Sequence, residues 1–150
     1  MTKAILHLVF FIFLFHIIGC SSEQTQSAES AVLKQPSLVI KVYETGGNNP
    51  TVFLPLLMWP SFESRMINIY AHFTGGGKSE HCVLQESEGS QLEVGTKVEV
   101  LEEATCLYVR LNPVEGSPKN YSAGIMRIRV VETGQEGWTW SKAIEFVDKE

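Results

Sequence analysis

Apolar and polar residues alternate in short segments of this chain, and this period of two most strongly constrains its fold. Residues 65–73 and 96–101 carry apolar side chains at nearly every second position, as in a half-buried strand. Glycine, proline and polar clusters separate such segments, and no helical apolar period persists for three turns after residue 20. We therefore expect an all-β sandwich or small barrel. The expected strands are residues 38–43, 65–73, 96–101, 106–111, 125–131, 138–140 and 144–147.

Two apolar or mixed stretches lack this alternation. Residues 52–59 are apolar but contain Pro55 and precede Pro60, which excludes a central strand and a long helix. We expect an edge strand or irregular segment there that packs on the core, with an exposed patch for a partner as the alternative. Residues 112–124 hold two prolines and two glycines and predict a long loop.

The first twenty residues have the three parts of an export signal. Lys3 is a short basic region, residues 4–18 are apolar, and Gly19 and Cys20 end the run. An apolar run of about 15 residues is shorter than the roughly 20 that a spanning helix needs. A polar tract follows, so we expect a processed signal peptide rather than a permanent membrane helix.

The segment Ile17-Ile18-Gly19-Cys20 resembles the lipobox of bacterial lipoproteins. The resemblance implies removal of residues 1–19 and acylation of Cys20, with palmitate as one expected chain. It places the protein on the exported side of a cell membrane. Ser21 after the cysteine implies outer-membrane sorting if the host has such a membrane. An ordinary secretory signal or an N-terminal anchor helix is the alternative.

Residues 20–36 follow as the lipidated cysteine and a linker. The stretch is rich in serine, glutamate and glutamine and has few apolar groups that could offset the entropy lost on ordering. We expect it to be flexible, with a span of roughly 20–25 Å from the membrane.

The charge balance argues against a nucleic-acid partner. Without residues 1–20, which contain one basic residue (Lys3), the chain has 11 Lys and Arg against 17 Asp and Glu, a net charge of −6. Phosphate contacts require clustered basic residues. The run Gly75-Gly76-Gly77-Lys78-Ser79 is no phosphate loop, because that motif requires a glycine where His72 stands. We expect neither nucleic acid nor nucleotide as partner.

Cys82 and Cys106 remain as an even pair in an exported chain, so we expect them to form a disulfide. Two buried free thiols are the first alternative. A metal site built from both cysteines with His72 and His81 is a more remote one. We expect no metal and no cofactor.

The second half resembles an SH3-like barrel of the bacterial extracytoplasmic kind. The resemblance rests on residues 92–101, a Gly turn feeding a Val-x-Val strand, on residues 107–111, and on residues 137–144, a Gly-Trp strand with a closing turn. It implies a barrel over residues 65–150, preceded by an N-terminal β extension over residues 37–64. Signalling SH3 domains have proline where Trp140 stands, so a proline-rich ligand is not expected.

Trp138 and Trp140 share one face of a regular strand, with Tyr108 as the expected neighbour. Such aromatic side chains can stack on a sugar or hold a peptide, so we expect a ligand-binding surface of Trp140, Tyr108 and Trp138. Packing in the core is the alternative for both tryptophans.

The sequence thus predicts a lipid-anchored, non-enzymatic module that binds a cell-wall component, such as peptidoglycan, or an envelope protein. An accessory subunit that docks through residues 52–59 is the alternative, and a small hydrolase or metal protein is a remote one. We expect no catalytic residues, because no nucleophile, base or paired carboxylates occur in a recognisable motif.

Overall fold

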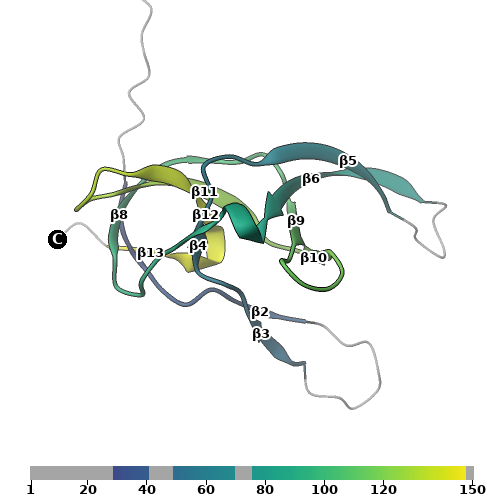
Figure 1. The fold of residues 1–150 in the computed structure, drawn as a ribbon, viewed down its shortest axis with the longest axis horizontal. Coiled ribbons are helices and arrows are strands. Elements are labelled where there is room, and N and C mark those ends of the chain that lie inside the picture. Colours follow the sequence, from purple (N-terminus) through teal and green to yellow (C-terminus); the bar gives the residue numbers. More distant parts are fainter. Residues whose placement is uncertain (1–28, 41–48, 70–75, 148–150) are drawn as a thin grey trace, which may run out of the picture.

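The computed structural model describes residues 29–40, 49–69 and 76–147. These residues form an all-β fold, which confirms the predicted class (Figure 1). A five-stranded sheet has the order β12-β11-β8-β1-β13, and a four-stranded sheet has the order β10-β9-β6-β5. The larger sheet consists of β1 (Glu29–Leu33), β8 (Lys97–Glu103), β11 (Ile125–Val130), β12 (Glu136–Trp140) and β13 (Ile144–Phe146). The smaller consists of β5 (Glu63–Ile69), β6 (Gly77–Gln85), β9 (Tyr108–Asn112) and β10 (Lys119–Tyr121).

Two short strand pairs and two 3₁₀ turns complete the architecture. β2 (Ser37–Val39) pairs with β3 (Thr51–Phe53), and β4 (Leu57–Met58) pairs with β7 (Ser90–Gln91). The 3₁₀ turns are η2 (Glu86–Glu88) and η3 (Ser141–Ala143). The β2–β3 pair extends from the body of the molecule as a two-stranded arm (Figure 1).

The expected closed barrel is not present, because the sheets of the described residues do not close on themselves. β12 and β13 are the two edges of the five-stranded sheet and are joined in sequence by η3. β9 follows β8 along the chain but pairs in parallel with β6 in the other sheet. β1 and β11 occupy the two positions beside β8, which leaves no place there for β9. The resemblance to the SH3-like family stays a prediction.

The expectation of a flexible linker is wrong for residues 29–36. β1 lies between β8 and β13, and antiparallel pairs form on both of its sides. Ala31 and Leu33 are buried, and Pro36 just after the strand is also buried. Burial of these few apolar groups outweighs the polar composition of the segment, which had predicted disorder. The part of the predicted linker before residue 29, like the signal peptide and Cys20, lies outside the described residues.

Residues 52–59 pack on the core, as the sequence predicted. β3 and β4 flank Pro55, and the side chains of Leu54, Met58 and Trp59 are buried. Trp59 also forms an isolated antiparallel bridge with Trp138 of β12. The segment is therefore tied by backbone hydrogen bonds to the second half of the chain, rather than being a separate extension.

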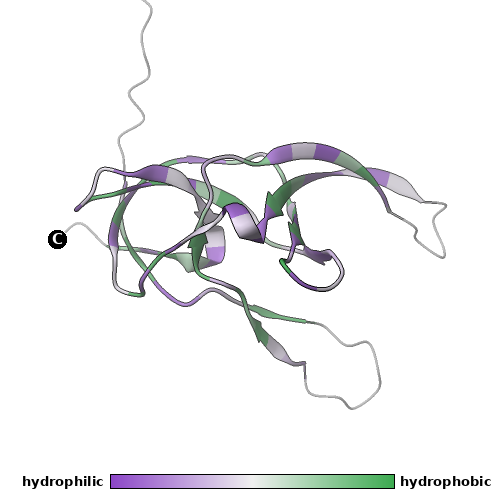
Figure 2. Ribbon diagram, in the orientation of Figure 1, coloured by the Kyte–Doolittle hydropathy of each residue, from purple (hydrophilic) through white to green (hydrophobic). Residues whose placement is uncertain are grey.

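Besides β1, sequence reasoning missed the strands β6 and β10. The sequence predicted no strand between residues 74 and 95, but β6 pairs with β5 on one side and with β9 on the other. Residues 81–84 are all buried, so this half of β6 is covered on both faces and shows no alternation. Figure 2 shows β6 changing along its length from hydrophilic to hydrophobic residues.

Two tryptophans form the centre of the core. Trp59 and Trp140 are both fully buried and meet edge to face, with ring centroids 5.6 Å apart. Each indole nitrogen donates a hydrogen bond to a backbone carbonyl, Trp59 to Gln85 at 2.8 Å and Trp140 to Pro55 at 2.9 Å. These bonds let two large polar-tipped side chains be buried without an unpaired donor.

Candidate functional site

The structure places Trp140 in the core, which corrects its assignment to a ligand-binding surface. Its exposed fraction is zero, and its ring packs edge-on against Trp59 and Tyr121. β12 is covered on both faces, since Thr139, which points to the opposite face, is also fully buried. Because both faces of β12 are covered at this position, Trp140 has no solvent-exposed face on which a ligand could stack.

Trp138 and Tyr108 do not form the expected surface with it. Trp138 is half-buried, and its ring contacts Phe62 edge-on with centroids 4.8 Å apart. Tyr108 belongs to the other sheet and stacks on the ring of His81, with centroids 5.3 Å apart. The three predicted ligand residues are thus distributed over a core position and two different sheets.

The predicted cysteine pairing is supported by the geometry. The sulfur atoms of Cys82 and Cys106 lie at disulfide distance, and their Cα atoms are 5.7 Å apart. Both cysteines are buried, as is His81, which precedes Cys82 and whose Nδ1 lies 3.1 Å from the carbonyl oxygen of Ser79. The remote alternative of a metal site also included His72, which lies outside the described residues.

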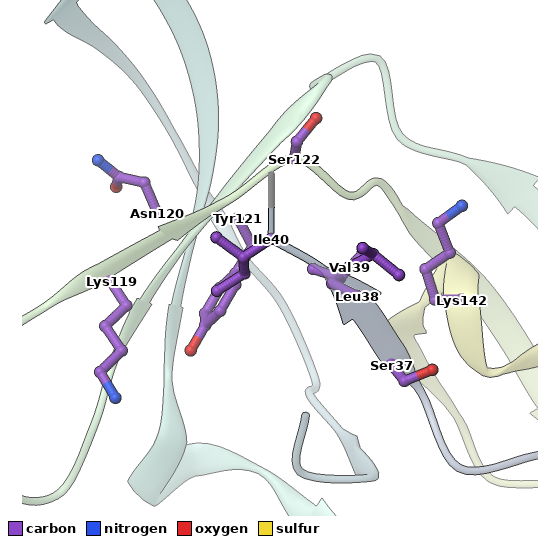
Figure 3. Close-up of a pocket in the computed structure, with 9 residues that line it drawn as sticks. All are labelled: Ser37, Leu38, Val39, Ile40, Lys119, Asn120, Tyr121, Ser122 and Lys142. Carbon is purple, nitrogen blue, oxygen red and sulfur yellow. The ribbon is translucent and has the colours of Figure 1, made fainter. Parts of the chain in front are cut away.

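A groove between the β2–β3 arm and the body is the candidate site. Its volume is about 950 Å³, which falls in the range of small-molecule and short-peptide sites. Figure 3 shows β2 on one side of the groove and β10 on the other, with η3 near one end. The lining residues are Ser37, Leu38, Val39, Ile40, Lys119, Asn120, Tyr121, Ser122 and Lys142.

The middle of the groove is apolar. Val39 and Ile40 are 61% and 45% exposed, and Leu38 beside them is half-buried. Tyr121 faces them from β10, and its ring packs edge-on against the buried Trp140 with centroids 5.7 Å apart. This contact connects the groove to the core, so Trp140 supports the wall of the site without touching a ligand itself.

Two lysines supply the charge of the groove. Lys119 and Lys142 are the charged side chains among its lining residues, and they lie toward opposite ends of it (Figure 3). Both are exposed, on a chain whose overall net charge is −5. A ligand with apolar groups between separated anionic groups would match this arrangement.

Tyr121 contributes a hydroxyl that remains protonated. Burial raises the pKa of its phenol, and the nearby Glu86 carboxylate raises that pKa further. Both effects disfavour the phenolate, so at neutral pH the hydroxyl is available as a hydrogen-bond donor. The groove therefore combines a neutral donor with two cationic groups.

Sequence reasoning did not find this site. Its residues come from three short segments, at 37–40, 119–122 and 142. About eighty positions separate the first from the second, and twenty separate the second from the third. None of these segments alone was recognised as a binding motif. The exposed pair Val39 and Ile40 lay in a predicted strand, and residues 119–122 lay in a predicted loop. A signal was present in the run of three apolar residues at 38–40, because a strand with one solvent face would place polar residues at alternate positions.

No helix in the described part of the chain is long and apolar enough to cross a membrane. The same residues contain no group of three or more histidine, cysteine, aspartate or glutamate side chains placed to hold a metal ion. No family model, no curated protein and no solved structure matches this chain.

Proposed function

We propose that this protein is a lipid-anchored, non-catalytic binding protein of the cell envelope. It recognises a cell-wall component or an envelope protein through the groove between β2 and β10. The observation that carries the proposal is this open groove of about 950 Å³, with apolar walls and a lysine toward each end. Such a site provides contact area and charge for recognition.

The membrane anchor in the proposal rests on the sequence of residues 3–20. A basic residue, an apolar run of subspanning length and a cysteine directly after Gly19 form the pattern of an acylated export signal. In the structure β1 begins at Glu29, nine positions after Cys20, so that eight residues (21–28) lie between the cysteine and the first strand. The folded part would therefore lie close to the membrane surface.

The anchor is tested by metabolic labelling with palmitate in cells that express the full chain. The wild type should carry label, and the Cys20→Ser variant should not. An unlabelled wild type would remove the lipid anchor from the proposal.

Binding through the groove is tested with the full chain in two assays. One is co-sedimentation with purified peptidoglycan, and the other is formaldehyde cross-linking in intact cells. Ile40→Glu places an acidic group inside the groove and should abolish the sediment or a defined cross-linked product. Val131→Glu is the matched control, because Val131 is 56% exposed and lies outside the groove. Absence of both signals in the wild type would reject the binding role.

The β2–β3 arm offers a second candidate function, docking as an accessory subunit. Within residues 52–59, Phe53 is the strongly exposed side chain, at 69%, whereas Leu54 and Trp59 are buried. Phe53 lies directly opposite Ser37 in the β2–β3 pair, and Val39 follows two residues on, so Phe53 and Val39 share one face of the arm. Of the exposed apolar patch that was the alternative prediction for residues 52–59, Phe53 is the strongly exposed large apolar side chain.

Cross-linking separates this second function from the first. Phe53→Asp should remove the cross-linked product while leaving co-sedimentation with peptidoglycan intact. Leu107→Asp is the control, because Leu107 is 77% exposed and lies outside the arm. A product that survives Phe53→Asp would exclude docking through this face.

A further inference from the structure

Resting on the proposed function, we propose that the occupant of the groove is an extended acidic segment of a protein partner. The segment would lie between β2 and β10 as an added strand. Its backbone would pair with the free edges of these strands, its apolar side chains would contact the groove wall, and its carboxylates would meet Lys119 and Lys142. This is recognition by strand addition, in which the backbone supplies affinity and alternate side chains supply specificity.

The edge of β2 that faces away from β3 is free to pair. Ile40 N–H donates to the carbonyl oxygen of Pro50, and Leu54 N–H donates to that of Pro36, both at 2.9 Å. In an antiparallel pair the residues that bond to the partner alternate with residues that point outward. Ser37 and Val39 therefore direct their backbone groups away from β3, and these groups have no backbone partner within the described residues.

β10 supplies the second edge. It is the terminal strand of the order β10-β9-β6-β5, and its register pairs residues 119–121 with β9 on one side. Within the described sheets its other side is unpaired, and Lys119 and Tyr121 of this strand line the groove. The groove is thus bordered by two strand edges, and an unpaired edge is a template for another extended chain.

The dimensions and charges favour a polypeptide segment with acidic residues. Each bordering strand has three residues and is about 10 Å long at about 3.3 Å per residue, so a segment of six residues, about 20 Å long, would cover either strand edge and extend beyond it. Leu38 and Ile40 offer apolar contacts to one face of such a segment, and the two lysines offer ion pairs near its ends. A basic segment would be repelled by these lysines.

The test uses the full chain in phosphatidylcholine nanodiscs and a fluorescein-labelled peptide, Glu-Val-Glu-Val-Glu-Val. Fluorescence anisotropy measures its affinity. The Gln-Val repeat, the all-D peptide and peptides N-methylated at every second residue serve as comparison probes. Each of them should bind at least about tenfold more weakly, since each removes charge, handedness or backbone donors that the added strand requires.

Two protein variants test the two parts of the site. Lys119→Glu combined with Lys142→Glu should weaken binding about tenfold, whereas Lys78→Glu combined with Lys97→Glu makes the same charge change outside the groove and should not. Val39→Pro removes an outward N–H while keeping the bonds from β2 to β3, and should weaken binding about tenfold. Thr51→Pro, opposite Val39 on β3, is its control.

Equal affinity for the N-methylated peptides or unchanged binding by Val39→Pro would overturn the strand-addition mode. Tighter binding of the all-D peptide would overturn it in favour of a cell-wall stem peptide, which contains D-residues. Absence of peptide binding together with retained co-sedimentation with peptidoglycan would overturn this inference alone and leave the proposed function standing. Far-UV circular dichroism confirms that each variant is folded.

Discussion

Replacing Trp140 with phenylalanine distinguishes a core tryptophan from a ligand-binding one. The wild-type ring is fully buried, packs edge-on against Trp59 and Tyr121, and donates a hydrogen bond to the carbonyl oxygen of Pro55. Phenylalanine keeps an aromatic ring at this position. It removes the indole nitrogen and the part of the ring that reaches Pro55.

The expected loss of stability has two parts. The removed volume is about 40 Å³, and at about 24 cal/mol per Å³ of cavity this costs about 1 kcal/mol. The Pro55 carbonyl is left without its donor in a partly buried position, which costs about 1–2 kcal/mol. The free energy of unfolding should therefore fall by about 2–3 kcal/mol.

Urea unfolding of residues 21–150, followed by far-UV circular dichroism, measures this loss. Trp138→Phe is the matched control, because Trp138 is half-buried and its ring nitrogen has no hydrogen bond among the described residues. Its expected loss is about 1 kcal/mol. A loss for Trp140→Phe that equals the control, together with lost ligand binding, would refute the core placement.

Three further predictions concern stability. Thiol labelling of the denatured chain should find Cys82 and Cys106 unreactive before reduction, and reduction should lower the free energy of unfolding by about 3.5 kcal/mol for a loop of 24 residues' separation. Labelling of Cys82 or Cys106 in the unreduced chain would contradict this prediction. Gly137→Ala should cost about 1–3 kcal/mol in a thermal melt, because a Cβ there would meet the Met58 side chain at 2.5 Å, whereas Gly77→Ala meets nothing within 4 Å and should be neutral. The pKa of Glu136 is lowered from 4.5, chiefly by its hydrogen bond from Arg129, so its contribution to stability is present above pH 4.5 and is lost as the pH falls through the lower folded-state value. Glu136→Gln should flatten the stability profile in that acidic range, and an unchanged profile would show that the pair contributes nothing.

Strands with one solvent face could be predicted from the sequence. β8 and β11 were expected within a few residues of their observed bounds, because their side chains alternate between core and surface. β6 was missed because residues 81–84 are buried on both faces of the strand, so apolar and polar residues do not alternate there with a period of two. β1 was missed because two buried side chains, Ala31 and Leu33, were too few to stand out from polar surroundings.

The position of the tryptophans required the tertiary structure. The spacing of Trp138 and Trp140 placed them on one face of a strand, but could not show that other segments cover that face. The covering residues include Trp59, from a segment about eighty positions earlier in the chain. Burial is a property of the assembled layers, so a local pattern does not determine it.

The sequence alone thus determined the all-β class, the pairing of Cys82 with Cys106 and the packing of residues 52–59. Each of these follows from local patterns: a period of two, an even number of cysteines, and an apolar run interrupted by proline. Only the tertiary structure decided the groove, because β2, β10 and η3 are far apart in the sequence and border one groove only in the folded chain. The free edges and lysines that make it a candidate site exist as a unit only after these segments have been brought together.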